Sequence, residues 1–128
     1  MKEKKYIMQQ TFVTSKLQKL TVTDANADYR GSITLGRNLI EAAGLKEFQY
    51  VHVNNWKTAQ HWETYVLAGE DGVVTLNGPP ARIFTKGDII FVLGFTDLDP
   101  SSESAQHNAV FVNEQNEVID VISYDINF

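Results

Sequence analysis

Gly31 and Ser32, in the stretch ADYRGSITL (residues 27–35), are the residues whose types and spacing most clearly allow chemistry. A serine that directly follows a glycine can attack its own preceding peptide bond. Glycine suits such a site because it tolerates a strained backbone and crowds neither the attack nor the tetrahedral intermediate. Glycine and serine are also common turn residues, so the pair has a purely structural interpretation as a chain reversal.

Two later segments carry polar residues in suggestive positions. In HWETYVLA (61–68), the alternation of a strand places His61, Glu63, Tyr65 and Leu67 on one face and Trp62, Thr64 and Val66 on the other. A tyrosine on a strand is most often a core residue with a solvated hydroxyl. Asn77-Gly78 followed by Pro79-Pro80 predicts a tight turn with Gly78 at positive φ, or alternatively a rigid wall of backbone donors beside a ligand.

Several common kinds of catalytic site are missing from the sequence. It contains no glycine-rich phosphate loop, no nucleophile elbow and no HExxH helix. His52, His61 and His107 are scattered, with no carboxylate or second histidine at a spacing that suggests a metal site, so we expect no metal. The absence of cysteine excludes disulfides, thiolate nucleophiles and cysteine-based metal sites.

Length and charge limit the possible partners. A chain of 128 residues is the usual size of one domain, so we expect residues 1–128 to form a single domain. The net charge of -5 argues against nucleic-acid binding, and Lys2, Lys4 and Lys5 predict a solvated tail. No apolar run approaches the roughly 20 residues that span a bilayer, and the start MKEKKYIMQQ lacks the features of a secretory signal. We therefore expect no membrane partner and a cytoplasmic location.

The hydrophobic pattern predicts a mainly β protein. The segment RNLIEAA (37–43), followed by Gly44, is typical of a short helix with a C-terminal glycine. We expect strands over 17–23, 48–54, 61–68, 73–76 and 89–95, an exposed loop over 97–107, and two strands around a turn from Asn113 to Asn116. Many short strands with one or two short helices fit a small closed barrel, with a sandwich as the alternative.

The order of these motifs provides a resemblance to a known family. SKLQKLTVT, ADYRGS, a helix ending AAGL, a strand with WETY, NGPPA and KGDII follow one another at nearly the spacing of bacterial pyruvoyl-dependent aspartate 1-decarboxylases. The chain resembles this family from about residue 15 to about residue 95. The resemblance implies a double-psi β-barrel and a homotetramer with active sites between neighbouring subunits. Some members need a helper protein to mature.

The resemblance also implies a self-processing zymogen. Autocatalytic cleavage between Gly31 and Ser32 gives a small chain (1–31) and a larger chain (32–128) that begins with a pyruvoyl group made from Ser32. This group forms a Schiff base with the substrate amine and accepts the electrons released as carbon dioxide leaves. Thr64 matches the family threonine associated with processing and the substrate pocket, and Tyr65 matches the residue assigned as proton donor.

The substrate-binding positions are partly retained. Asn77, Gly78, Pro79 and Pro80 match the family's substrate-contacting run, although the two prolines stand where small residues are usual and remove two N–H donors. Lys16 aligns with a lysine that helps to hold the substrate carboxylate. His61 occupies the position of the family's carboxylate-binding arginine and offers a weaker grip on a carboxylate.

These matches predict a pyruvoyl-dependent lyase that converts L-aspartate into β-alanine, as used in pantothenate biosynthesis, and carbon dioxide. One alternative is a decarboxylase of a different amino acid, in which the chemistry is kept and the specificity has moved. A second alternative is a barrel that does not process itself and acts as a binding or assembly module.

Overall fold

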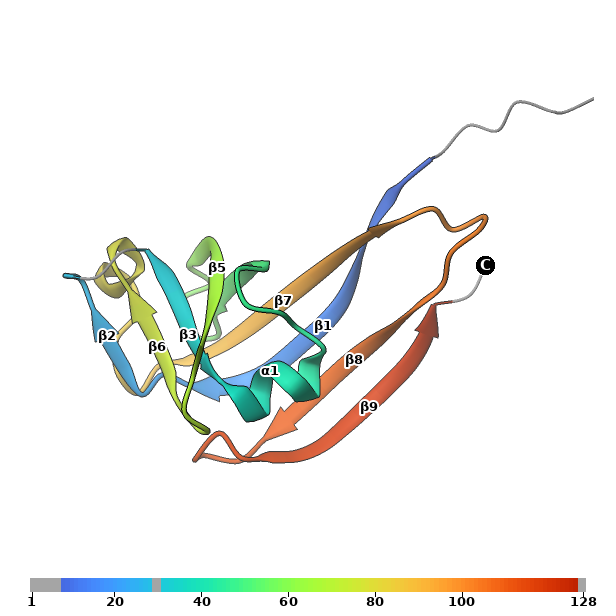
Figure 1. Cartoon of the computed structure of the whole chain (residues 1–128). Coiled ribbons are helices and arrows are strands. Elements are labelled where there is room, and N and C mark those ends of the chain that lie inside the picture. The colour runs from blue at the N-terminus through green and yellow to red at the C-terminus, as the bar shows by residue number, and fades with distance from the viewer. Residues whose placement is uncertain (1–7, 29–30, 127–128) are drawn as a thin grey trace, which may run out of the picture.

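Nine strands form one hydrogen-bonded sheet in the computed structural model, which describes residues 8–28 and 31–126 (Figure 1). The strands in chain order are β1 (Gln10–Thr21), β2 (Asp24–Asn26), β3 (Ser32–Gly36), β4 (Tyr50–Asn55), β5 (His61–Gly69), β6 (Val74–Asn77), β7 (Ile89–Leu98), β8 (Ala105–Val112) and β9 (Val118–Ile126). Along the sheet their order is β2-β6-β3-β5-β4-β7-β1-β8-β9.

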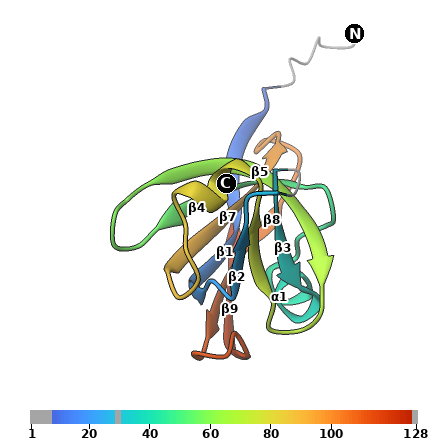
Figure 2. The same ribbon diagram turned by 90° about the vertical axis from the view of Figure 1, so that its left-hand side faces the viewer.

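The sheet curls into a small barrel because β1 and β2 are consecutive in the chain but distant in the strand order. Only Val22 and Thr23 join them, and the backbone N–H groups of these residues donate to Asp88 O (2.8 Å) and Val74 O (2.7 Å), respectively. Figure 2 shows the strands around a common interior. That interior is filled by fully buried apolar side chains, among them Leu17, Leu20, Ile33, Leu35 and Phe84. The predicted small barrel is confirmed, and the sandwich alternative is not.

Strand β1 lies at the centre of one half of the sheet. It pairs antiparallel with β7 and parallel with β8, so that Lys16 is opposite Leu93 on one side and Ala109 on the other. The predicted strand over 17–23 is therefore wrong at both ends, since β1 spans Gln10–Thr21. Residues 10–16 are rich in polar side chains, and their strand conformation comes from pairing with β7 rather than from an alternating pattern.

The predicted helix over 37–43 is confirmed as α1 (Arg37–Ala43). Gly44 ends it in the left-handed conformation at φ 73°, where glycine has no side chain to strain. The helix packs onto the barrel through buried apolar residues and is also tied to β1, because Ser15 Oγ donates to Ala43 O at 2.6 Å. A 3-10 helix, η1, spans Pro79–Arg82. Neither helix in the described ranges has the length and apolar character needed to cross a bilayer.

The C-terminal region forms a hairpin of β8 and β9 around the predicted turn. The loop predicted over 97–107 is too long, because β7 continues to Leu98 and β8 begins at Ala105. Strand β9 lies at the edge of the sheet and is largely exposed, including Ile119 (65%) and Tyr124 (55%). Polar residues stand on both sides of each end of this loop, so the local sequence did not show where strand pairing ends in β7 and begins again in β8.

Asn116, in the turn between β8 and β9, is fully buried and connects three parts of the chain. Its Oδ1 accepts from the Thr21 N–H at 2.9 Å, and its Nδ2 donates to Thr21 O and Gly72 O, both at 2.9 Å. Asn38 Nδ2, from α1, donates to the Asn116 backbone carbonyl at 3.0 Å. This asparagine has φ 59°, a conformation that asparagine tolerates better than most residues. It fixes the hairpin to the end of β1 and to the turn before β6.

We expect Asn116→Ala to lower the free energy of unfolding by about 1–3 kcal/mol, because it leaves backbone groups of Thr21 and Gly72 without their partner. Denaturant unfolding followed by circular dichroism measures the change. Gln115→Ala, in the same turn but exposed, is the matched control and should change stability by less than about 0.5 kcal/mol. Equal losses in the two variants would contradict the role assigned to the amide.

Candidate functional site

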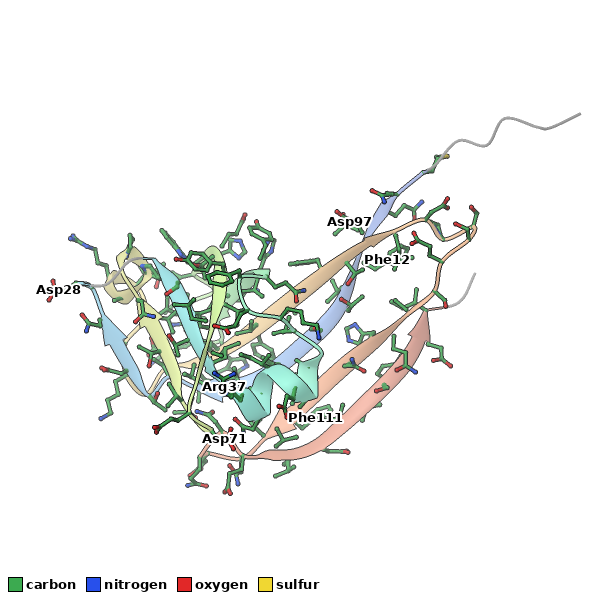
Figure 3. All side chains as sticks on the ribbon, in the orientation of Figure 1. Phe12, Asp28, Arg37, Asp71, Asp97 and Phe111 are labelled. Atoms are coloured by element: carbon green, nitrogen blue, oxygen red, sulfur yellow. The ribbon has the colours of Figure 1, made fainter. Side chains whose placement is uncertain are left out.

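Ser32 is the first residue of β3 and is held by pairing on both sides of that strand. β3 is parallel to β5 and antiparallel to β6, where Ser32 is opposite Asn77. The serine is only 1% exposed. Asp28, shortly after β2, lies at the same end of the barrel as η1, whereas Arg37, the first residue of α1, and Asp71 lie at the other end (Figure 3). The pairing of Ser32 with Asn77 places Ser32 near the end of β6, just before η1.

The side-chain amide of Asn77 organises the hydroxyl groups of β3. Its Nδ2 donates to Ser32 Oγ and to Thr34 Oγ1, each at 3.0 Å. Ser32 and Thr34 are two residues apart on one strand, so they share a face and can both reach one amide. Because Asn77 is itself 7% exposed, the amide and the serine hydroxyl meet in a site largely closed to water.

The run from Gly78 to Pro80 follows directly and packs beside Gly31. A Cβ on Gly31 would lie 3.6 Å from Pro79 Cδ, an ordinary van der Waals contact. Gly78 has φ 78°, as predicted for the turn, and its N–H donates to Asn26 O at 2.8 Å. The two prolines open η1, where a backbone N–H has no partner within the helix in any case. Gly78, Pro79 and Pro80 therefore offer a ligand no free N–H, and the alternative of a wall of backbone donors does not hold for these three residues.

Thr64 and Tyr65 reach the same region from β5. The parallel pairing of β3 and β5 begins with Ile33 and Val66, directly after Ser32 and Tyr65. Thr64 is 8% exposed, whereas the half-buried Tyr65 stacks on Phe48 with ring centroids 6.1 Å apart. Most of the predicted site residues lie on or directly beside three neighbouring strands and η1: Gly31, Ser32, Thr64, Tyr65, Asn77, Gly78, Pro79 and Pro80.

The predicted carboxylate-binding residues, Lys16 and His61, lie apart from this group within one chain. Lys16 is on β1, and three strands separate β1 from β3 in the sheet. Its Nζ lies 5.8 Å from the centroid of the Phe91 ring. His61 begins β5 and precedes Tyr65 by four residues, or roughly 13 Å at the rise of about 3.3 Å per residue of a strand.

His61 instead belongs to a polar cluster on the exposed face of β4 and β5. Its Nδ1 is 2.7 Å from Asn54 Oδ1, and its Nε2 is 2.9 Å from Glu63 Oε2. The ring of His52 lies 4.8 Å from that of His61, and the Tyr50 hydroxyl donates to Glu63 Oε1. The expectation that the histidines are scattered away from any carboxylate is therefore wrong for His52 and His61.

The cause is the antiparallel register of β4 and β5, which places His52 opposite Glu63 and Asn54 opposite His61. Sequence spacing alone did not fix this register. A signal was nevertheless present: alternate residues of one predicted strand are Tyr50, His52 and Asn54, and those of the next begin with His61 and Glu63. Two such strands joined by a short loop bring these side chains to one face.

Hydrogen bonding in the cluster changes the acidity of two groups. The Tyr50 hydroxyl, and after it His61, hold the pKa of the Glu63 carboxyl below its usual value, because both stabilise the carboxylate. The same bond to Glu63 raises the pKa of Tyr50, with a smaller contribution from burial. Glu63 is therefore an anion and Tyr50 a neutral donor near neutral pH.

A pocket of about 360 Å³ adjoins the cluster and is lined by Thr11, Gln49, Tyr50, His52, Phe95 and Asp97. Tyr50 and His52 thus belong both to this pocket and to the polar cluster. The pocket does not include Ser32 or Asn77. One chain accordingly carries two distinct groups of reactive side chains, a buried one at Ser32 and an exposed one at His61.

The sequence is similar to one family over most of its length. The family described as aspartate decarboxylase matches residues 8–119. An aspartate 1-decarboxylase of Neisseria meningitidis is 36% identical over 121 residues, which cover 92% of this chain and 95% of the relative. One from Clostridium acetobutylicum is 36% identical over 122 residues, covering 92% and 95%, and one from Dehalococcoides mccartyi is 39% identical over 110 residues, covering 84% and 89%.

We expect Tyr50→Phe to raise the pKa of Glu63 toward its usual value, because the variant removes the donor that lowers it most. A carboxyl with a lowered pKa stabilises the folded state above its unfolded pKa, and this contribution is lost as the pH falls through the lowered value. In the variant this contribution is smaller, and its loss is complete at a higher pH. A carbon-13 NMR titration of the Glu63 carboxyl measures the change, with Tyr124→Phe as the control. An unchanged Glu63 titration in Tyr50→Phe would contradict the assigned bond.

Proposed function

The chain belongs to the aspartate decarboxylase family, a family of lyases, and on this basis we propose that it is a self-processing enzyme that converts L-aspartate into β-alanine and carbon dioxide. The observation that carries the proposal is the burial of Ser32, a serine that directly follows a glycine. Its hydroxyl accepts a hydrogen bond from the Asn77 amide at 3.0 Å. The turn interpretation of Gly31-Ser32 requires neither the burial nor the bond.

In the proposed processing reaction, Ser32 Oγ attacks the carbonyl carbon of Gly31. The bond from that carbon to the Ser32 nitrogen breaks as an ester to Oγ forms. Elimination then releases the Gly31 carboxylate, and hydrolysis with loss of ammonia leaves a pyruvoyl group at the start of residues 32–128. The low exposure of Ser32 supports this sequence, since a dry site limits direct hydrolysis of the peptide bond. Thr64, also nearly buried, is the proposed hydrogen-bond partner of the reacting carbonyl.

The residues around Ser32 fit a group of this kind. The position is small, buried and provided with an amide donor in Asn77. A pyruvoyl group supplies the electron-accepting carbonyl that decarboxylation of an amino acid needs. Tyr65 is the proposed proton donor, and its stacking on Phe48 limits the directions in which its ring can point. Gly78, Pro79 and Pro80 contact the substrate through packing, because none of them has a free N–H.

The similarity of the chain to aspartate 1-decarboxylases favours aspartate as the substrate over a different amino acid, and an enzyme over a barrel without catalysis. The relatives described above are all aspartate 1-decarboxylases, which supports neither a different amino acid nor a barrel without catalysis. Lys16 and His61 are the proposed contacts of the substrate carboxylate. They lie away from Ser32 in one chain, so we propose that they complete the site of a neighbouring subunit in a homotetramer. Exposed apolar residues on β9 and at Phe48 (71%) and Trp56 (60%) are available for such contacts.

The two products of cleavage should stay together. Strand β1 belongs to the small chain 1–31 and lies between β7 and β8 of the larger chain. Separating the two chains requires breaking both pairings and exposing Leu17 and Leu20, which are fully buried. The processed enzyme is therefore two chains in one folded unit.

We expect purified protein to convert into two chains, 1–31 and 32–128, that elute together under native conditions. Intact-mass spectrometry after denaturation measures this, and the larger chain should begin with a pyruvoyl group rather than serine. Ser32→Ala should remain one chain. Thr34→Val is the matched control, because it removes the other hydroxyl bonded to Asn77, and it should still cleave.

A wild-type chain that stays intact after prolonged incubation, alone and with an extract of the source cells, would overturn the processing proposal. Cleavage only with the extract would indicate that maturation needs a helper protein.

We expect the processed protein to release carbon dioxide from L-aspartate in preference to other amino acids. Tyr65→Phe should cleave normally but turn over roughly 10²–10⁴-fold more slowly, since the proton donor is missing. Carbon dioxide release from a panel of amino acids checks both statements. Faster release from another amino acid would reject aspartate as the substrate, and full activity of Tyr65→Phe would require a different proton donor.

A further inference from the structure

We propose that His52, His61 and Glu63, on the exposed face of β4 and β5, bind a divalent transition-metal ion, for which Zn²⁺ is the best match. Each residue offers one ligand atom, and these atoms all lie within 4.8 Å of one another. The metal site is separate from self-cleavage at Ser32 but shares His61 with the proposed substrate contacts, so a metal bound there would replace the His61 side chain as the group that faces the substrate carboxylate.

The spacing of the ligand atoms suits a small ion. Glu63 Oε2 is 2.9 Å from His61 Nε2, and Glu63 Oε1 is 3.9 Å from His52 Nε2. A tetrahedral ion with bonds of about 2.0–2.1 Å holds its ligand atoms roughly 3.4 Å apart. All three side chains project from one face of two paired strands, so rotation of the side chains can adjust these distances.

The contacts of His61 leave its Nε2 as the ligand atom. Asn54 Oδ1 accepts a hydrogen bond from Nδ1 at 2.7 Å. Nε2 therefore faces the Glu63 carboxylate at 2.9 Å, where a metal ion can bond to both groups in place of a proton. Metal-binding histidines usually have a second hydrogen-bond partner that fixes the orientation of the ring, and Asn54 is that partner for His61.

The other two ligands are also held in place. The Tyr50 hydroxyl donates to Glu63 Oε1, which limits the rotation of the carboxylate. The His52 ring makes edge contacts with the rings of Phe95 and His61, with centroids 4.5 Å and 4.8 Å away. Packing and hydrogen bonds therefore restrict all three ligands before a metal arrives, which lowers the entropy cost of binding.

The donor types select the class of metal and leave room for a further ligand. Two imidazoles and one carboxylate favour Zn²⁺ or a neighbouring transition metal over Mg²⁺ and Ca²⁺, which prefer sites made of oxygen. Three protein ligands leave one tetrahedral position free. The side chains of His61 and Glu63 are 41% and 49% exposed, so water or an oxygen atom of a small molecule can occupy that position.

The test is a calorimetric titration of the full-length protein with ZnCl₂, repeated with MgCl₂. We expect saturable binding of one Zn²⁺ per chain and none of Mg²⁺. His52→Ala, His61→Ala and Glu63→Gln should each weaken binding at least roughly tenfold, and Asn54→Ala, at a positioning residue, by roughly 10–100-fold. His107→Ala is the matched control, because it removes a half-buried histidine that contacts Val13 O instead, and it should bind like the wild type.

The Ser32→Ala protein, which cannot process itself, should bind Zn²⁺ with unchanged affinity, so this outcome separates the metal site from the proposed enzyme activity. Absence of saturable Zn²⁺ binding overturns the proposal. So does binding that persists in the three ligand variants, or that falls equally in His107→Ala. Circular dichroism of every variant confirms that a lost signal comes from a folded protein.

Discussion

The side-chain amide of Asn77 can reach Ser32 and Thr34 only while β3 keeps its register between β5 and β6. A shift of one residue would turn Ser32 to the opposite face, and a shift of two would keep the face but move Ser32 away from the Asn77 amide. The rest of the barrel maintains this register. The Asn116 amide holds Gly72 O in the turn before β6, and the curl of the sheet returns β2 to the side of β6.

Strand β5 connects the two groups of reactive side chains and gives them different surroundings. Near Tyr65 it lies beside the buried hydroxyls of β3, where electrostatic interactions are strong because water is largely excluded. At His61 it is exposed, and the interactions there are weakened by solvent. The His61 ring contacts the side chains of Asn54 and Glu63 rather than the buried hydroxyls of β3.

The sequence predicted the helix over 37–43, the strands after it and the small barrel, because these depend on local pattern and on capping by Gly44. The order of motifs shared with a family also singled out Ser32 and Asn77, whose side chains are in contact in the fold. The sequence did not predict the cluster at His61, because the register of β4 and β5 is a property of the folded sheet. Asn116 was missed for a related reason. It is one of several polar residues in its turn, and its burial arises from contacts with Thr21 and Gly72, far away in the sequence.

The central place of β1 also determines when the protein can fold during its synthesis. Its partners are β7 and β8, and Lys16 is 77 residues before its partner Leu93. At about 5–20 residues per second, a ribosome needs roughly 4–15 s to make the intervening chain. During that time β1 has neither of its neighbours, and its apolar residues depend on chaperones or transient contacts for protection. The first strand to leave the ribosome is therefore among the last to find its place.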